Sequence, residues 1–328
     1  MSIAGSVAEL VGQGAERASM KTADSLSGST FEWVEIDGRR CLLKYLCLDD
    51  DWIMRATGDL EVRQVELWRR GLFERLPDCL DAALLGVAAW RKPDGRACAA
   101  LLMRDVSPNL VPPGGEVIAV GAHHQFLDHM ARMHVEMAGE HLDDVFPVVT
   151  HYLVLGPAMA ELEMARGTGG VPPEVASGWS RFEGAAPRAA GMVAALLSDP
   201  TPLVQALETT PQTTIHGDWK LGNLGRAADG RTILLDWDRC GRGPACLDLA
   251  WYLAVNCDRI PGSKEDAIDY YRSRLEAHGL DTGGWFERQL GLALIGSLLQ
   301  LGWAKTGGDP AEIAWWEERA LVAAPLLG

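Results

Sequence analysis

The chain changes character near residue 105, and this change constrains the fold more than any other feature. Before it, short apolar runs alternate with turn signals; after it, most periodic segments have the spacing of amphipathic helices. A connector rich in proline and glycine, residues 107–115, separates the two parts. A chain of 328 residues has room for about two structural units. We therefore expect an α+β protein with a β-rich lobe, residues 1–105, and a larger helical lobe, residues 106–328.

The first lobe is expected to be a small antiparallel sheet with one inserted helix. Asp37-Gly38 favours a two-residue hairpin turn because both positions take positive φ. Pro93-Asp94-Gly95 marks a second turn. The predicted elements, in chain order, are strands at 29–36 and 39–46, a helix across 59–75, and strands at 83–90 and 97–103.

The second lobe is expected to be mainly helical, with one pair of short strands. The strands, 213–216 and 232–236, are expected to pair with each other. That pairing would bring the polar residues that follow each strand to one place. The predicted helices lie at 116–138, 157–166, 187–198, 246–256, 264–278, 285–305 and 311–323.

The charge of the chain argues against nucleic acid as a partner. The net charge is −15, and no run of Lys and Arg is longer than two. A nucleic-acid backbone would be repelled by such a chain. Most of the excess, −12, lies after residue 105. This acidity suits a cationic ligand, and a helical surface kept soluble by its charge explains it equally well.

The cysteines and the hydropathy pattern bear on the expected location. The seven cysteines are scattered and contain no C-x-x-C pair, which argues against a secreted disulfide framework and a zinc ribbon. The first twenty residues lack the apolar stretch of a signal peptide, and no run approaches the ~20 apolar residues of a membrane span. We expect a cytoplasmic protein without a membrane partner.

The polar residues with the clearest chemical pattern follow the two strands of the second lobe. Residues 214–223 read TIHGDWKLGN, so Asp218 and Asn223 follow the first strand. Residues 233–238 read ILLDWD, which places Asp236 at the end of the second. If the strands pair, two carboxylates and an amide surround one small volume.

Phosphoryl transfer needs a set of this kind, because the protein contributes mostly positioning and charge neutralisation. A carboxylate accepts or orients the proton of the attacking hydroxyl, and Asp218 fits that role. An amide oxygen and a second carboxylate suit Mg²⁺, which prefers oxygen ligands. Lys220, two residues after Asp218, can meet the transferring phosphate.

The H-G-D-W-K-L-G-N and L-L-D-W-D runs resemble the catalytic loop and metal-binding segment of the aminoglycoside phosphotransferase family, which has a two-lobed protein-kinase-like fold. The resemblance implies Asp218 as catalytic base, Asn223 and Asp236 as Mg²⁺ ligands, and Asp248 as a buried support of the loop. Many family members have proline where Leu221 stands. Lys220 instead matches the Asp-x-Lys-x-x-Asn arrangement of Ser/Thr protein kinases.

The same resemblance places the nucleotide on the first lobe. Lys44, flanked by apolar residues on its strand, would contact the α- and β-phosphates. Its partner is expected to be Glu61, although the spacing to Trp68 points to Gln64, and Glu66 lies on another face of the helix.

Two further segments complete the expected nucleotide site. The turn Ser27-Gly28-Ser29 could cover the phosphates with backbone N–H and hydroxyl groups, although it lacks a full G-x-G-x-x-G. Met103 and Asp105 lie where the sheet meets the connector, and this segment resembles the hinge whose backbone pairs with adenine. ATP is the expected donor, with GTP left open, and Mg²⁺ is the expected metal.

The sequence thus predicts a kinase that transfers phosphate from ATP to a hydroxyl of a small molecule. An aminoglycoside, another basic antibiotic, an amino sugar and an amino alcohol all remain open as acceptors. The first alternative is a protein kinase, but the eleven residues between Asp236 and Asp248 are too few for a regulated peptide-docking loop. The second alternative is a catalytically silent nucleotide-binding module, against which the intact set of polar residues argues.

Overall fold

The structure, a computed structural model, describes residues 2–20 and 27–328. It divides into two compact units, which are described separately. The first unit contains Met1–Leu110 and Gly225–Asp238, and the second contains Val111–Leu224 and Arg239–Gly328. In the part of the chain that is described, no helix has the length and apolarity needed to cross a membrane.

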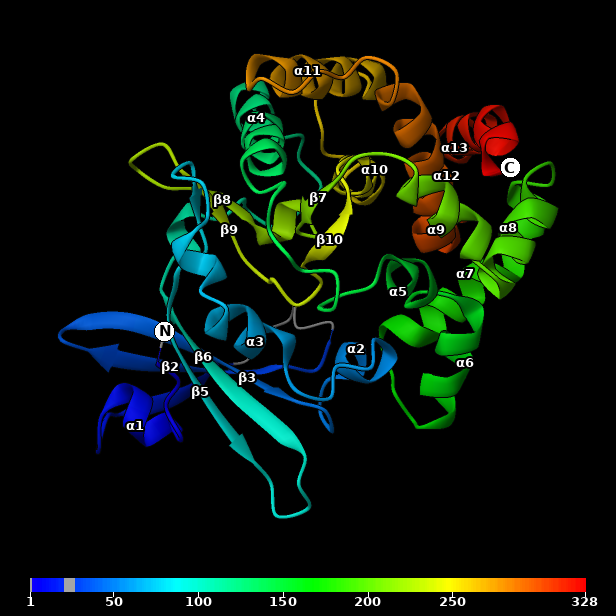
Figure 1. Cartoon of the computed structure of the whole chain (residues 1–328). Coiled ribbons are helices and arrows are strands. Elements are labelled where there is room, and N and C mark those ends of the chain that lie inside the picture. Colours follow the sequence, from blue (N-terminus) through cyan, green and yellow to red (C-terminus); the bar gives the residue numbers. More distant parts are fainter. Residues whose placement is uncertain (1, 21–26) are drawn as a thin grey trace. The chain divides into compact units, whose positions relative to one another are not determined.

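Five strands of the described residues form the antiparallel sheet of the first unit (Figure 1). Their order in the sheet is β1-β2-β3-β6-β5. The strands are β1 (Arg17–Met20), β2 (Thr30–Ile36), β3 (Arg39–Cys47), β5 (Leu84–Arg91) and β6 (Ala97–Arg104).

Both hairpins predicted in this unit are confirmed. Asp37 and Gly38 have φ of 51° and 70°, the left-handed conformation that the β2–β3 turn requires. The β5–β6 hairpin, in cyan in Figure 1, turns at Gly95 with φ of 88°.

Three short helices of the described residues accompany the sheet: α1 (Val7–Val11), α2 (Trp52–Ala56) and α3 (Arg63–Arg69). The helix predicted across 59–75 is realised as α3 and a 3₁₀ turn, Leu72–Glu74. Val65 and Trp68 of α3 pack with Leu101 and Met103 of β6 in one buried core. Burial of these apolar side chains fixes α3 against the sheet.

The predicted pairing of 213–216 with 232–236 is wrong. Strand β9 (Thr232–Leu234) lies between β4 (Leu80–Asp81) and β8 (Leu224–Arg226) instead. Strand β7 (Gln212–Ile215) pairs with β10 (Gly241–Pro244). The Asp229-Gly230 turn folds the chain back locally, with Gly230 at φ of 89°, and so gives β9 its neighbour β8.

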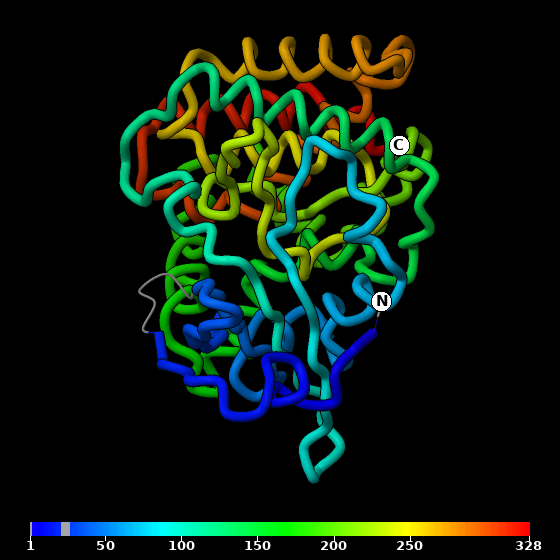
Figure 2. Tube along the Cα trace, turned by 90° about the vertical axis from the view of Figure 1, so that its left-hand side faces the viewer, coloured from blue at the N-terminus to red at the C-terminus, as the bar shows by residue number. Residues whose placement is uncertain are grey.

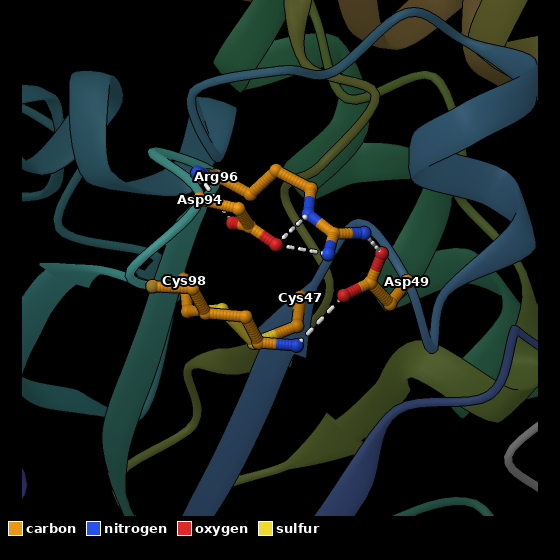
Figure 3. The surroundings of a disulfide bond; sticks show 6 residues. Cys47, Asp49, Asp94, Arg96 and Cys98 are labelled. Atoms are coloured by element: carbon orange, nitrogen blue, oxygen red, sulfur yellow. Dashed lines mark hydrogen bonds and ion pairs between the residues drawn. A yellow bond between two sulfur atoms is a disulfide. The ribbon is translucent and has the colours of Figure 1, made fainter.

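A disulfide joins Cys47 and Cys98, which are register partners on β3 and β6 (Figure 3). Beside it, Asp49 accepts a hydrogen bond from Lys92 at 2.8 Å and pairs with Arg96. The scattered cysteines gave no indication of this bond. The other five cysteines form no disulfide.

The second unit is built from helices. Helix α12 (Phe286–Lys305) is buried along most of its length and packs against α10 (Cys246–Val255) and α13 (Pro310–Ala323). Helix α11 (Lys264–Ala277), in orange in Figure 2, runs along α4 (Val120–Glu136). The remaining helices are α5 (Val148–Leu153), α6 (Pro157–Ala165), α7 (Val171–Ala185), α8 (Ala190–Ser198) and α9 (Thr201–Glu208).

Seven of these helices were expected from periodicity, and α5, α7 and α9 were not. Proline interrupts the helical signal in two of the missed segments, since Pro172 and Pro202 lie in the first turns of α7 and α9. Proline is compatible with a first turn because its missing N–H has no partner there in any case.

Candidate active site

The loop after β7 presents Asp218 through a tight turn at Gly217. Gly217 has φ of 76°, a conformation that L-residues rarely adopt. A Cβ at this position would collide with the ring of His151 and the carbonyl oxygen of Arg239. Only glycine therefore fits at position 217.

Asp218 is held by the two residues that were predicted beside it. Its Oδ2 accepts hydrogen bonds from Lys220 Nζ at 2.7 Å and from Asn223 Nδ2 at 3.0 Å. Its Oδ1 is buried and has no hydrogen-bond partner among the described residues. An oriented carboxylate with one open oxygen can accept a proton from a hydroxyl placed against it.

The orientation of Asn223 is fixed by its amide nitrogen. Nδ2 also donates to the backbone oxygen of Asp218 at 3.0 Å. With its nitrogen engaged on this side, the side chain keeps its Oδ1 for another ligand. The 3₁₀ turn that carries it, Leu221–Asn223, is anchored where Leu221 N donates to Asn256 Oδ1 at 3.0 Å.

Asp248 supports the loop that carries Asp218, as the family resemblance implied. It is fully buried on α10, and its carboxylate accepts hydrogen bonds from the backbone nitrogens of His216 and Gly217, both at 2.7 Å. His134 Nε2 lies 3.1 Å from Asp248 Oδ2. Burial by itself raises the pKa of Asp248, but the hydrogen bond from His134 and these neighbours hold it below its usual value.

Lys44 and Asp236 come together within the first unit. The Lys44 ammonium donates a hydrogen bond to Asp236 Oδ1. Burial alone would lower the pKa of Lys44, but Asp236, Asp238 and Asp51 together raise it, so the side chain stays charged. Asp236 itself has φ of 61°, a strained conformation of the kind that collects at functional sites.

The turn Ser27-Gly28-Ser29 is fastened to the start of α2 by Asp51. Ser29 Oγ donates to Asp51 Oδ2 at 2.9 Å, and Trp52 N donates to Ser27 O at 3.0 Å. Gly28 has φ of 101°, and a Cβ there would collide with the oxygen of Asp50. The turn is therefore anchored to the segment that follows β3, the strand of Lys44.

The acidic side chains of α3 and of the preceding turn are engaged away from Lys44. Glu61, the partner predicted for Lys44, is 69% exposed and pairs with Arg91 at 2.6 Å. Glu66 pairs with Arg69 and Arg70. Gln64 is buried and faces a pocket that Asp236 also lines. The structure thus brings Lys44 to Asp236, and not to Glu61.

The expected hinge residues lie at the end of β6. Met103 is buried and lines the same pocket as Gln64. The Asp105 carboxylate accepts hydrogen bonds from Arg40 at 2.7 Å and from Ser107 Oγ at 2.7 Å. Burial raises the pKa of Asp105, but the hydrogen bonds from Ser107 and Arg40 bring it below its usual value. Its side chain is therefore occupied within the first unit.

Several residues of the site were missed by sequence reasoning. Asp51 belongs to the run Asp49-Asp50-Asp51, and nothing in its pattern distinguishes it from a solvated turn. His134 is one of four histidines on α4, and their spacing does not single it out. Asn256 lies just past the end of α10 and contacts the catalytic loop, 35 residues earlier in the chain. Such contacts leave no local signal.

Comparison with solved structures establishes the fold. LicA in complex with AMP is 13% identical with a TM-score of 0.54, and the match covers 98% of this chain and 95% of that chain. Choline kinase LicA from Streptococcus pneumoniae is 12% identical with a TM-score of 0.51, and the match covers 95% and 93%. The predicted α+β, kinase-like fold is confirmed.

Sequence comparison identifies the family. No curated protein matches the chain. The model of the phosphotransferase enzyme family (APH) matches residues 100–285, more than half of the chain, and this stretch includes the catalytic loop and Asp236. The resemblance read from the motifs is thereby confirmed, and the chain belongs to the phosphotransferase enzyme family.

Proposed function

We propose that this phosphotransferase moves the γ-phosphoryl group of ATP to a hydroxyl group of a small molecule, with Asp218 as catalytic base. The observation that carries the proposal is the open Oδ1 of Asp218. It is buried and without a hydrogen-bond partner among the described residues, while Oδ2 is held by Lys220 and Asn223. A buried carboxylate oxygen left open in this way needs a donor from the substrate.

In the proposed reaction the acceptor oxygen forms a bond to the γ-phosphorus, and the bond between that phosphorus and the oxygen of ADP breaks. The hydroxyl proton passes to Asp218 Oδ1 and is later released to water. Lys220, whose Nζ is 2.7 Å from Asp218 Oδ2, would neutralise charge on the transferring phosphate.

Magnesium is the metal that the donor set suits, with Asn223 and Asp236 as its protein ligands. Carboxylate and amide oxygens are preferred by Mg²⁺, and the fixed nitrogen of Asn223 leaves its oxygen for this purpose. Bound with the nucleotide, Mg²⁺ neutralises charge on the phosphates. Among the described residues, no three His, Cys, Asp or Glu side chains cluster as a metal site. This fits an ion that is held largely by phosphate oxygens and water.

The nucleotide contacts are proposed for residues of the first unit. Lys44 would turn from Asp236 to the α- and β-phosphates, and the turn Ser27-Gly28-Ser29 would contact phosphate oxygens. The backbone of Met103 and Asp105 would pair with the base. ATP is the proposed donor, and GTP is the alternative to be tested beside it.

The acceptor is proposed to be a small molecule and not a peptide. Residues Gly241–Pro244, in the short stretch between Asp236 and Asp248, are held as strand β10 against β7. These residues are therefore not free to dock a peptide. The negative charge after residue 105 favours a cationic acceptor. Amino alcohols stand first in the panel, because LicA is a choline kinase, followed by amino sugars, aminoglycosides and other basic antibiotics.

The test is transfer of label from γ-³²P-ATP and γ-³²P-GTP to each member of this panel, with magnesium and with EDTA. We expect a labelled product from at least one small acceptor, formed only with magnesium and formed roughly 10²–10⁴ times more slowly by Asp218→Asn. Casein and histone serve as generic protein acceptors. Label that appears on these proteins and on no small molecule would favour the protein-kinase alternative. Nucleotide binding with neither transfer nor hydrolysis would favour the silent binding module.

A further inference from the structure

A pocket inside the first unit contains one amide that the proposed reaction does not use. It is lined by Gln64 of α3, by Asp236, and by apolar side chains from β5, β6 and the segment after α3. The lining residues are Gln64, Phe73, Ala82, Leu84, Leu101, Met103, Asp236 and Trp237. Gln64 and Asp236 are its only side chains with hydrogen-bonding oxygen atoms.

The amide of Gln64 is buried without a partner for its nitrogen. Gln64 is 4% exposed, and its Nε2 has no hydrogen-bond partner among the described residues. A buried donor in this condition is unfavourable and calls for an acceptor in the working protein. Within the lining, Trp237 cannot serve, because its indole nitrogen is itself a donor and already bonds Leu234 O at 2.8 Å. The carboxylate of Asp236 is the acceptor at hand.

The present partner of Asp236 indicates when a hydrogen bond from Gln64 would be used. In the structure Lys44 donates to Asp236 Oδ1. In the proposed reaction Lys44 moves to the nucleotide phosphates, and the hydrogen bond from Lys44 to Asp236 is lost. Glu61 and Glu66 cannot take the place of Lys44, because an ionised carboxylate has no proton to donate. Both also pair with arginines.

We propose that Gln64 is a positioning residue for Asp236: when nucleotide draws Lys44 away, Gln64 Nε2 donates a hydrogen bond to the Asp236 carboxylate and keeps it oriented toward magnesium. The inference rests on the proposed function, since it assigns Asp236 to the metal. A neutral amide suits the task because it orients the carboxylate and leaves its negative charge for the cation. A carboxylate in its place would repel Asp236, and an ammonium group would compete with the metal.

The test separates positioning from packing by using Gln64→Leu beside a matched control, Gln289→Leu. Gln289 is also a fully buried amide, but it is fully engaged, accepting from Cys246 N and donating to Thr210 Oγ1 and Pro211 O. Calorimetry gives the Kd of ADP with magnesium and with EDTA for each variant. Thermal melting of the ligand-free protein gives its stability.

For Gln64→Leu we expect the affinity for ADP with magnesium to fall by about tenfold or more, the size of one hydrogen bond to a charged group. The affinity in EDTA should stay within about twofold, and the Tm should not fall, because the lost nitrogen had no partner. Gln64→Glu should lose magnesium-dependent affinity as well. For Gln289→Leu we expect the opposite pattern, a lower Tm and an unchanged ratio of the two affinities.

An unchanged ratio in Gln64→Leu would overturn the inference, whether or not the Tm falls. If the ratio is unchanged in Gln64→Leu and the wild-type protein binds MgADP and transfers phosphate, the proposed function stands and only the role of Gln64 fails. If the wild-type protein shows no magnesium-dependent nucleotide binding, the proposed function fails and the role of Gln64 fails with it.

Discussion

His134 Nε2 lies 3.1 Å from Asp248 Oδ2, and both side chains are fully buried. Because the ionised carboxylate can only accept, His134 Nε2 donates this hydrogen bond, and His134 Nδ1 lies 2.6 Å from the Tyr271 hydroxyl. The same carboxylate holds the backbone of His216 and Gly217. Helices α4, α10 and α11 thus meet the catalytic loop through one buried acid.

Asp248→Ala is expected to destabilise the protein by about 3–5 kcal/mol, because it leaves several buried donors without their acceptor. Urea unfolding measures the change. Asp199→Ala is the control: Asp199 is an exposed acid that accepts one backbone hydrogen bond, from Thr201, and its loss should change little. An equal change in the free energy of unfolding for the two substitutions would contradict the role of Asp248 in supporting the catalytic loop.

Asp218→Asn is expected to lower kcat by roughly 10²–10⁴, the usual effect of removing a positioned base. Asparagine keeps the size of the side chain but cannot take the hydroxyl proton. Nucleotide affinity should stay near the wild-type value, because Asp218 is not assigned to the nucleotide. Release of ADP in the presence of a working acceptor measures the rate. Turnover of Asp218→Asn at the wild-type rate would refute the role of Asp218 as catalytic base.

Asp236→Ala is expected to weaken magnesium-dependent binding of ADP by more than about tenfold, since charge stabilisation by a bound metal is worth several kcal/mol. Calorimetry with magnesium measures this affinity, and the same titration in EDTA is the control. The proposal requires a larger loss with magnesium than in EDTA. An equal loss of ADP affinity with magnesium and in EDTA would mean that Asp236 only holds Lys44 and does not bind the metal.

The parts of this site that the sequence predicts are those with local signals. Asp218, Lys220 and Asn223 lie within six residues on one loop, so their closeness follows from chain connectivity. Asp37-Gly38 predicts its hairpin because the turn requires two positive φ values. In both cases the chemistry of a short segment decides its conformation.

The rest depends on contacts between distant segments. Strand β10, Gly241–Pro244, consists of glycine, arginine and proline, which are not typical of strands, so the partner of β7 went unrecognised. The pairing of Lys44 with Asp236 spans 192 residues. Gln64 was recognised by its spacing alone, and its buried, unpaired amide becomes visible only in the packed unit.

Reduction of the Cys47–Cys98 disulfide is expected to cost about 2–4 kcal/mol, because the bond closes a loop with a sequence separation of 51 residues and so restricts the unfolded chain. Dithiothreitol should lower the Tm of the wild-type protein. A variant with both cysteines changed to serine should melt at the lower temperature and not respond to dithiothreitol. Equal Tm values for oxidised and reduced protein would contradict this prediction.

Acid should destabilise the second unit through His123, in the window between pH 6.5 and about pH 4. Burial, with a smaller contribution from His124, lowers the pKa of His123 from 6.5 to about 4. Between these values the unfolded chain binds a proton that the folded protein does not, so stability falls as the pH falls. The stabilisation is complete above pH 6.5, and its loss amounts to roughly 3 kcal/mol by pH 4.

The ring of His123 stacks on Tyr252, and its Nδ1 lies 2.9 Å from the Tyr252 hydroxyl. In His123→Phe the ring remains but cannot take a proton, so this part of the pH dependence should disappear. Urea unfolding at pH 7, 5.5 and 4 measures it as the difference between the two proteins. Asp248 does not account for this window. Its ordinary pKa is 3.8 and is lowered further in the folded protein, so its contribution to stability is lost only near and below pH 3.8. Parallel curves for the two proteins between pH 7 and pH 4 would mean that His123 takes up its proton in the folded state as readily as in the unfolded chain.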